Sequence, residues 1–172
     1  MFIRTKNINS NHYAYIVKNF WTDQGPRQKV VGYAGKMVRL NPIREVELKE
    51  LTGIKPEVFF KNNSWEEIAE LLIVRELLRH GFSKKFSKKE TLLVLDSITV
   101  DISKRKVRQG KKRVALAMNE GYLCDWSLEE LLKLSKTKHP KPEKVASIIL
   151  ESGLKIEKTN FVLAYKKLTA QL

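Results

Sequence analysis

Cys124 is the residue with the clearest potential for covalent chemistry, and it lies in the polar segment 119–126. Three further polar residues share this segment: Glu120, Tyr122 and Asp125. A cysteine nucleophile needs a neighbouring general base to take up the thiol proton, and no histidine lies near Cys124 in the sequence. We therefore expect no catalytic residue, and we interpret the segment as a structural turn with Cys124 half buried. A small enzyme that uses the 119–126 turn stays open as the last of three alternatives.

Metal binding is not indicated either. The three histidines are His12, His80 and His139, and no two of them lie at metal-ligand spacing. Because Cys124 is the single cysteine, an internal disulfide and a cysteine-rich zinc site are both excluded. The sequence predicts no metal site and no cofactor.

The basic residues give the stronger chemical signal. The chain has 172 residues, with 33 Lys and Arg against 19 Asp and Glu, so its net charge is +14. Such an excess indicates a polyanionic partner, because each nucleic-acid phosphate that is neutralised releases a counterion. An anionic membrane surface is the competing polyanion. The sequence has no apolar run of about 18 residues and no secretory-type leader, so we expect a soluble, cytoplasmic protein without a membrane partner.

The charge is concentrated in two segments. Residues 1–40 carry a net +6 and residues 81–113 a net +8, whereas residues 41–80 carry −2 and residues 114–172 carry +2. Both basic segments have the residue pattern of β-hairpins. The predicted binding surface is therefore local.

The first predicted hairpin has arms at 13–20 and 27–34, joined by a turn at 21–26 that holds Asp23, Gly25 and Pro26. Basic and aromatic residues are interleaved along it, as in surfaces that contact phosphates and bases. The alternative is a core hairpin whose aromatic residues pack inward. The candidate contacts here are Tyr13, Tyr15, Lys18, Trp21, Arg27, Lys29, Tyr33 and Lys36.

The second predicted ribbon spans 97–118. Apolar residues alternate over 97–102, a basic run covers 103–113 with a turn at Gln109 and Gly110, and 114–118 returns as a buried strand. A basic tip on a rigid ribbon can follow a phosphate backbone. The alternative is a solvated loop whose lysines block edge pairing, but seven basic residues in ten exceed that need. The candidate contacts here are Lys104, Arg105, Lys106, Arg108, Lys111, Lys112 and Arg113.

Helices are predicted between and after the ribbons. Ser64 and Glu67 form a capping box that opens a helix to about residue 80, which Gly81 ends. A second capping box, Ser127 with Glu130, opens a helix to about residue 136. Further helices are expected at 42–51, 142–152 and 158–170, with a basic linker at 83–89.

The segment 13–35 resembles the N-terminal hairpin of DDE-type insertion-sequence transposases. The matching motif is Arg27-Gln28-Lys29-Val30 followed by Tyr33 and Gly35, in about a seventh of the chain. The catalytic region of that family, with three separated carboxylates on a ribonuclease-H-like core, has no room here. The resemblance therefore implies a shared nucleic-acid-contacting module, without transposition. The remainder resembles a small uncharacterised archaeal protein family.

These observations predict an α+β protein in which two basic β-ribbons pack with the central helix and a small helical region closes the C-terminus. We expect a hairpin module at 1–40, a central region at 41–135 and a C-terminal helix pair at 136–172. The predicted function is non-catalytic binding of structured RNA, with association with a ribosomal particle as one setting. DNA binding by an accessory protein related to the transposase module is the alternative, and the C-terminal helices are a candidate surface for a protein partner.

Overall fold

The computed structural model describes residues 1–86, 91–138 and 140–169. It confirms the α+β class, with 37% helix and 37% strand. The strands are β1 (Phe2–Ile8), β2 (Asn11–Thr22), β3 (Gly25–Arg39), β4 (Ser83–Phe86), β5 (Thr91–Leu95), β6 (Ile98–Asp101), β7 (Lys106–Gln109), β8 (Lys112–Met118) and β9 (Gly121–Leu123). The helices are α1 (Leu48–Thr52), α2 (Pro56–Asn62), α3 (Trp65–Arg79), α4 (Asp125–Leu132), the 3-10 turn η1 (Lys133–Lys136), α5 (Pro142–Glu151) and α6 (Lys158–Leu168).

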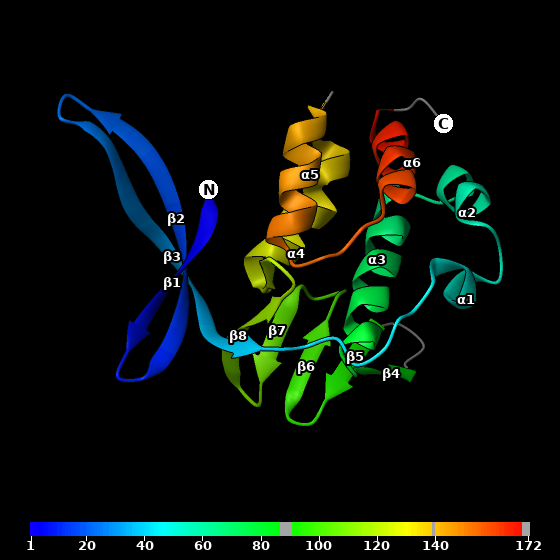
Figure 1. Ribbon diagram of the computed structural model, residues 1–172, viewed down its shortest axis with the longest axis horizontal. Helices are drawn as coiled ribbons and strands as arrows, with labels where there is room; N and C mark the ends of the chain where they lie inside the picture. Colours follow the sequence, from blue (N-terminus) through cyan, green and yellow to red (C-terminus); the bar gives the residue numbers. More distant parts are fainter. Residues whose placement is uncertain (87–90, 139, 170–172) are drawn as a thin grey trace.

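The described strands form one sheet with the order β1-β2-β3-β8-β7-β6-β5-β4, and β9 also pairs with β8. Strands β3 and β8 are parallel, and the other neighbours are antiparallel. Figure 1 shows that β1–β3 project to one side, whereas α3, α4, α5 and α6 all lie on one side of the strands β4–β8. The long N-terminal hairpin thus reaches the body through β8.

The first predicted hairpin is confirmed, with longer strands than expected. The predicted turn at 21–26 is too wide, since Trp21 pairs with Pro26 inside the ladder and only Asp23 and Gln24 lie between the strands. Sequence reasoning also missed β1, which pairs with β2 only as far as Val17. Residues 18–29 therefore continue as a two-stranded extension, which we call the arm (Figure 1).

Gly35 lies where the backbone of β3 comes close to the backbone of β8. Its φ is +131°, and a Cβ atom there would lie 2.7 Å from the backbone of Arg113 and Val114. Immediately after it, residues 36–39 pair with residues 114–117 of β8. A residue without a side chain is needed for this close approach of two backbones.

The second basic segment is not a single ribbon with a basic tip, and this prediction is wrong. Strands β5–β8 form a meander, and the run 103–113 contains β7 between two turns. The first turn includes Arg105 in the left-handed region, with φ 55°. Val107 explains the strand, because its side chain is fully buried and the residue pairs with the buried Val100. The predicted inward alternation of Ile98, Val100 and Ile102 is confirmed.

Helix α3 begins and ends where the capping signals predicted, and most of its residues are buried. The Ser64 N–H donates to Glu67 Oε2 at 2.7 Å, and the Glu67 N–H donates to Ser64 Oγ at 3.3 Å. Gly81 follows the helix with φ +90°. The buried residues of the helix belong to one core cluster with apolar side chains of the sheet, among them Leu93, Val100, Val107 and Leu116.

The helix predicted at 42–51 is wrong in its extent. Only α1, at the end of this segment, is helical. The preceding residues are held against α3 by its arginines. Arg75 Nε donates to the Val46 carbonyl at 2.7 Å, and Arg79 donates two hydrogen bonds to the Glu45 carboxylate at 2.9 and 3.1 Å. These long-range contacts replace the local hydrogen bonds of a helix.

Two further local predictions need correction. The expected linker 83–89 begins with the strand β4, while its positions 87–89 lie outside the described residues. Helix α4 starts at Asp125 with Cys124 as N-cap, so Ser127 is its third residue and not its cap. The Cys124 N–H donates to Ser127 Oγ at 2.9 Å, which explains why the helix starts earlier.

The C-terminal helix pair is confirmed as α5 and α6, with Pro142 in the first turn of α5. The expected end of the second helix at residue 170 lies outside the described residues. Among the described helices, none is long and apolar enough to cross a membrane.

Candidate nucleic-acid interface

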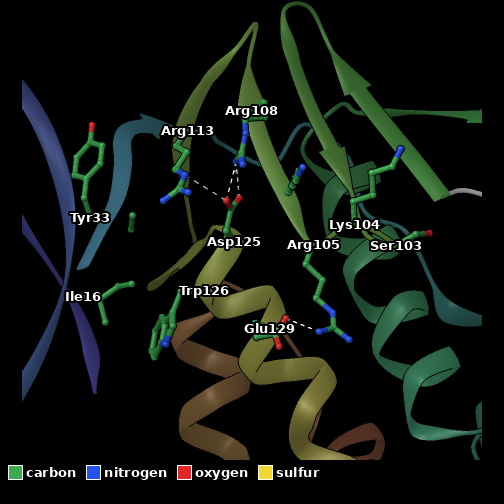
Figure 2. A pocket seen from close by; sticks show the side chains of 12 residues that line it. Ile16, Tyr33, Ser103, Lys104, Arg105, Arg108, Arg113, Asp125, Trp126 and Glu129 are labelled. Atoms are coloured by element: carbon green, nitrogen blue, oxygen red, sulfur yellow. Dashed lines mark hydrogen bonds and ion pairs between the residues drawn. The ribbon is translucent and has the colours of Figure 1, made fainter. Parts of the chain in front are cut away.

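A groove of about 590 Å³ separates the projecting strands from the body. Figure 2 shows Ile16 and Tyr33 on one side of it, with residues of β7, β8 and α4 on the other. The first basic segment thus borders the groove through apolar and aromatic residues, whereas the cations of the groove all come from the second. Its lining residues are Ile16, Tyr33, Ala34, Ser103, Lys104, Arg105, Lys106, Arg108, Arg113, Asp125, Trp126 and Glu129.

Asp125 organises the basic side chains at one end of the groove. Arg108 Nη1 donates to both carboxylate oxygens of Asp125, at 2.7 and 2.8 Å (Figure 2). The Val107 N–H donates to the same carboxylate at 2.8 Å, and Arg113 Nε lies 3.8 Å from it. Asp125 therefore fixes the start of α4 to β7 and holds Arg108 in place. The Arg113 side chain, which is 60% exposed, is only loosely paired.

Glu129 forms a second ion-pair cluster one turn further along α4. Its carboxylate accepts hydrogen bonds from Arg105 Nη1 at 2.5 Å and from Lys133 Nζ, which lies 2.8 Å away. Hydrogen bonds from Lys133 and then Arg105 hold the pKa of Glu129 below its ordinary value. Because the carboxylate stays charged, it neutralises part of the basic character of Arg105.

The predicted cations of the second segment now fall into two groups. Arg105 and Arg108 pair with groove acids, and Lys104 Nζ lies 3.3 Å from Asp101. Four others project from the exposed surface: Lys106, Lys111, Lys112 and Arg113. With five cationic side chains against two acidic ones among its lining residues, the groove keeps an excess of positive charge.

Three tyrosines form a cluster on the projecting strands. The ring of Tyr33 lies 5.5 Å from that of Tyr15 and 6.4 Å from that of Tyr13, measured between centroids. Lys6 Nζ lies 5.5 Å from the Tyr15 ring centroid, in cation–π range. Partial burial, followed by the neighbouring Tyr13 and Tyr15, raises the pKa of Tyr33. The cluster offers neutral aromatic rings beside a cation.

The arm carries basic and aromatic residues in register. Lys18 pairs with Lys29 and Phe20 pairs with Arg27, so each pair shares one face of the arm. Trp21 is 82% exposed near the end of the arm. Large aromatic side chains at this exposure contact little of the protein's own surface, and they are available to a partner.

The structure brings most predicted contacts to three neighbouring surfaces. Tyr33 and the cations 104–106, 108 and 113 border the groove, Tyr13 and Tyr15 join Tyr33 in the cluster, and Lys18, Trp21, Arg27 and Lys29 lie on the arm. Lys36 pairs with Tyr13 across the sheet. Lys111 and Lys112 lie at the β7–β8 turn, outside the groove lining.

Several residues of these surfaces were not expected from the sequence. They are Lys6, Ile16, Phe20, Asp125, Trp126 and Glu129. The alternating pattern of residues 2–8 could have revealed β1 and so placed Lys6. The other groove residues come from distant segments and carry no sequence signal of their own.

The segment around Cys124 is more buried than predicted. Cys124 is fully buried beside Ala14, Ala34 and Ala115, and not half buried. Burial raises the pKa of its thiol, which disfavours the reactive thiolate. His80 is also buried, and its Nδ1 lies 2.8 Å from the Glu76 carbonyl oxygen. Within the described residues, no group of three or more His, Cys, Asp or Glu side chains is placed to hold a metal ion.

Comparison of the chain with known protein families, with curated proteins and with solved structures gives no match in any of the three. The resemblance of residues 13–35 to a transposase hairpin stays a prediction.

Proposed function

We propose that this protein binds nucleic acid without catalysing a reaction on it, and that the groove between β1–β3 and the body is the principal contact. The observation that carries the proposal is a groove whose cations all come from the second basic segment and whose other side is formed by the strands of the first. A phosphate backbone would contact the exposed cations Lys106 and Arg113, and the less exposed Arg108 would add positive charge next to them. The arm would extend the contact through Lys18, Arg27 and Lys29.

Structured RNA is the favoured partner, and the ribosomal particle is one setting in which such RNA occurs. The groove cations come from strands and turns, whereas the helix that borders the groove presents the acids Asp125 and Glu129. A recognition helix for the major groove of DNA would present basic and amide side chains there. Exposed aromatic residues such as Trp21 suit the unpaired bases of folded RNA.

Duplex DNA is the second candidate, and the arm is the observation that favours it. A two-stranded β-ribbon fits the major groove of B-DNA, whereas the major groove of A-form RNA is too narrow for side-chain reading. The arm is such a ribbon, with Lys18 and Lys29 paired across it.

Affinity purification from cell lysate, with separate nuclease treatments, distinguishes these partners. The proposal predicts that the protein co-purifies with RNA, and that the association is lost with RNase and retained with DNase. Loss with DNase alone would select DNA. Purification free of both nucleic acids, together with no binding of purified RNA or DNA, would reject the proposed function.

A further inference from the structure

The free edge of β3 lies between the groove and the tyrosine cluster. From Gly25 to Gly35, β2 is the only strand partner of β3 in the described structure, and pairing with β8 begins at Lys36. The opposite edge of β3 over these residues therefore has no neighbouring strand in the described structure, and Tyr33 and Ala34 of this stretch line the groove. A bound polynucleotide that leaves the groove beside Tyr33 can therefore pass around this free edge of β3.

Tyr33 belongs to both surfaces. It lines the groove together with Ala34, and its ring lies 5.5 Å from that of Tyr15. A register shift explains the dual position, since Ala14 pairs with Gly35 and Tyr15 pairs with Tyr33, which leaves Ala34 as the extra residue. Such a bulge bends the strand and redirects its side chains.

The two surfaces provide different chemistry. The groove supplies exposed cations, with Lys106 and Arg113 bordering it. The cluster supplies three aromatic rings, of which Tyr33 is 44% exposed. A single-stranded polynucleotide has a charged phosphate backbone from which unpaired bases project. Proteins that bind single strands therefore combine a basic groove with aromatic rings on which the bases stack.

From this arrangement we propose that the groove and the tyrosine cluster form one continuous track for an unpaired segment of nucleic acid. The backbone of that segment lies along Lys106 and Arg113, crosses the free edge of β3 at Tyr33, and places bases on Tyr33 and Tyr15. This inference rests on the proposed function and specifies the strand that the site takes. A duplex reaches the cations of the groove but offers no bases to the tyrosines.

Equilibrium binding with single-stranded and duplex probes of about 12 nucleotides tests the track, because this length lies within the range that compact single-strand binders cover. Oligouridylate and oligothymidylate serve as the single strands, so that RNA and DNA are compared directly. Tyr33→Ala should weaken single-strand binding about fivefold or more and leave duplex binding nearly unchanged. Tyr33→Phe, which keeps the ring, should bind both probes like the unmodified protein.

A variant that combines Lys106→Gln with Arg113→Gln, the groove variant, separates the two proposals. It should weaken both probes, because it removes phosphate contacts. If Tyr33→Ala and Tyr15→Ala leave single-strand binding unchanged while the groove variant weakens it, the track is wrong and groove binding stands. Equal losses for single strand and duplex in Tyr33→Ala would also overturn the track. If the groove variant affects neither probe although both bind, the assignment of the groove as the principal contact fails, and the track fails with it.

Discussion

Removing the two loosely held cations of the groove should reduce the salt dependence of binding by a calculable amount. Lys106 and Arg113 border the groove, and Arg113 Nε lies 3.8 Å from the Asp125 carboxylate. If each contacts one phosphate, the groove variant should lose about 0.7–0.9 units per cation from the slope of log K against log salt, so about 1.4–1.8 in total. Over a rise from about 50 to 200 mM salt, the variant should then lose roughly tenfold less affinity than the unmodified protein.

Fluorescence anisotropy with a labelled single-stranded RNA at a series of salt concentrations measures this slope. The matched control combines Lys49→Gln with Lys55→Gln, which removes the same charge beside α1 and α2, on the side of the body away from the groove (Figure 1). The control should keep most of the slope. Equal slopes for the groove variant and the unmodified protein would show that neither Lys106 nor Arg113 contacts a phosphate, and an equal decrease in both variants would show that total charge, rather than the groove, governs binding.

Three further outcomes are expected. Gly35→Ala should lower the free energy of unfolding by about 3 kcal/mol or more, because its backbone has a positive φ and a Cβ atom would overlap the backbone of β8. The control Gly110→Ala, which has open space around it, should lower that free energy by only about 1–2 kcal/mol. Denaturant titration measures both, and similar losses would show that the close approach at Gly35 adds no cost. Because burial raises the folded pKa of Cys124, its contribution to stability is present below the unfolded pKa of about 8.5 and is lost as pH rises through the folded pKa. Denaturant titrations across this range should show a decline that Cys124→Ala lacks, and identical pH profiles would contradict it. Glu129→Gln should release Arg105 and raise RNA affinity by about twofold to fivefold, while weaker binding would mean that the pair positions Arg105 for its ligand.

The elements that the sequence predicted well depend on local signals. Ser64 with Glu67, Gly81 and Pro142 each act within one turn of a helix, so their effects can be read from neighbouring residues. The first hairpin was likewise visible from its alternating residues and its turn. Its long arm was missed because strand length beyond residue 20 depends on pairing across the turn.

The missed features depend on residues distant in the sequence. Val107 is a single apolar residue between Lys106 and Arg108, so the sequence gives little sign that it is buried. Its burial follows from its pairing with Val100 of β6. The pairing of Arg108 with Asp125 joins positions 17 residues apart, so a sequence count of cations overestimates the free charge of the second segment. The groove itself could not be predicted, because it results from the parallel pairing of β3 with β8.

Photo-crosslinking of the purified protein to 4-thiouridine-containing RNA, followed by mass spectrometric mapping, locates the bound strand on the protein surface. We expect attachment at residues that border the groove and the tyrosine cluster, with Tyr33 and Tyr15 as the aromatic sites closest to the bound strand. Attachment confined to α1, α2 or α6, or no attachment under conditions where RNA binds, would contradict the assignment of this groove as the nucleic-acid interface.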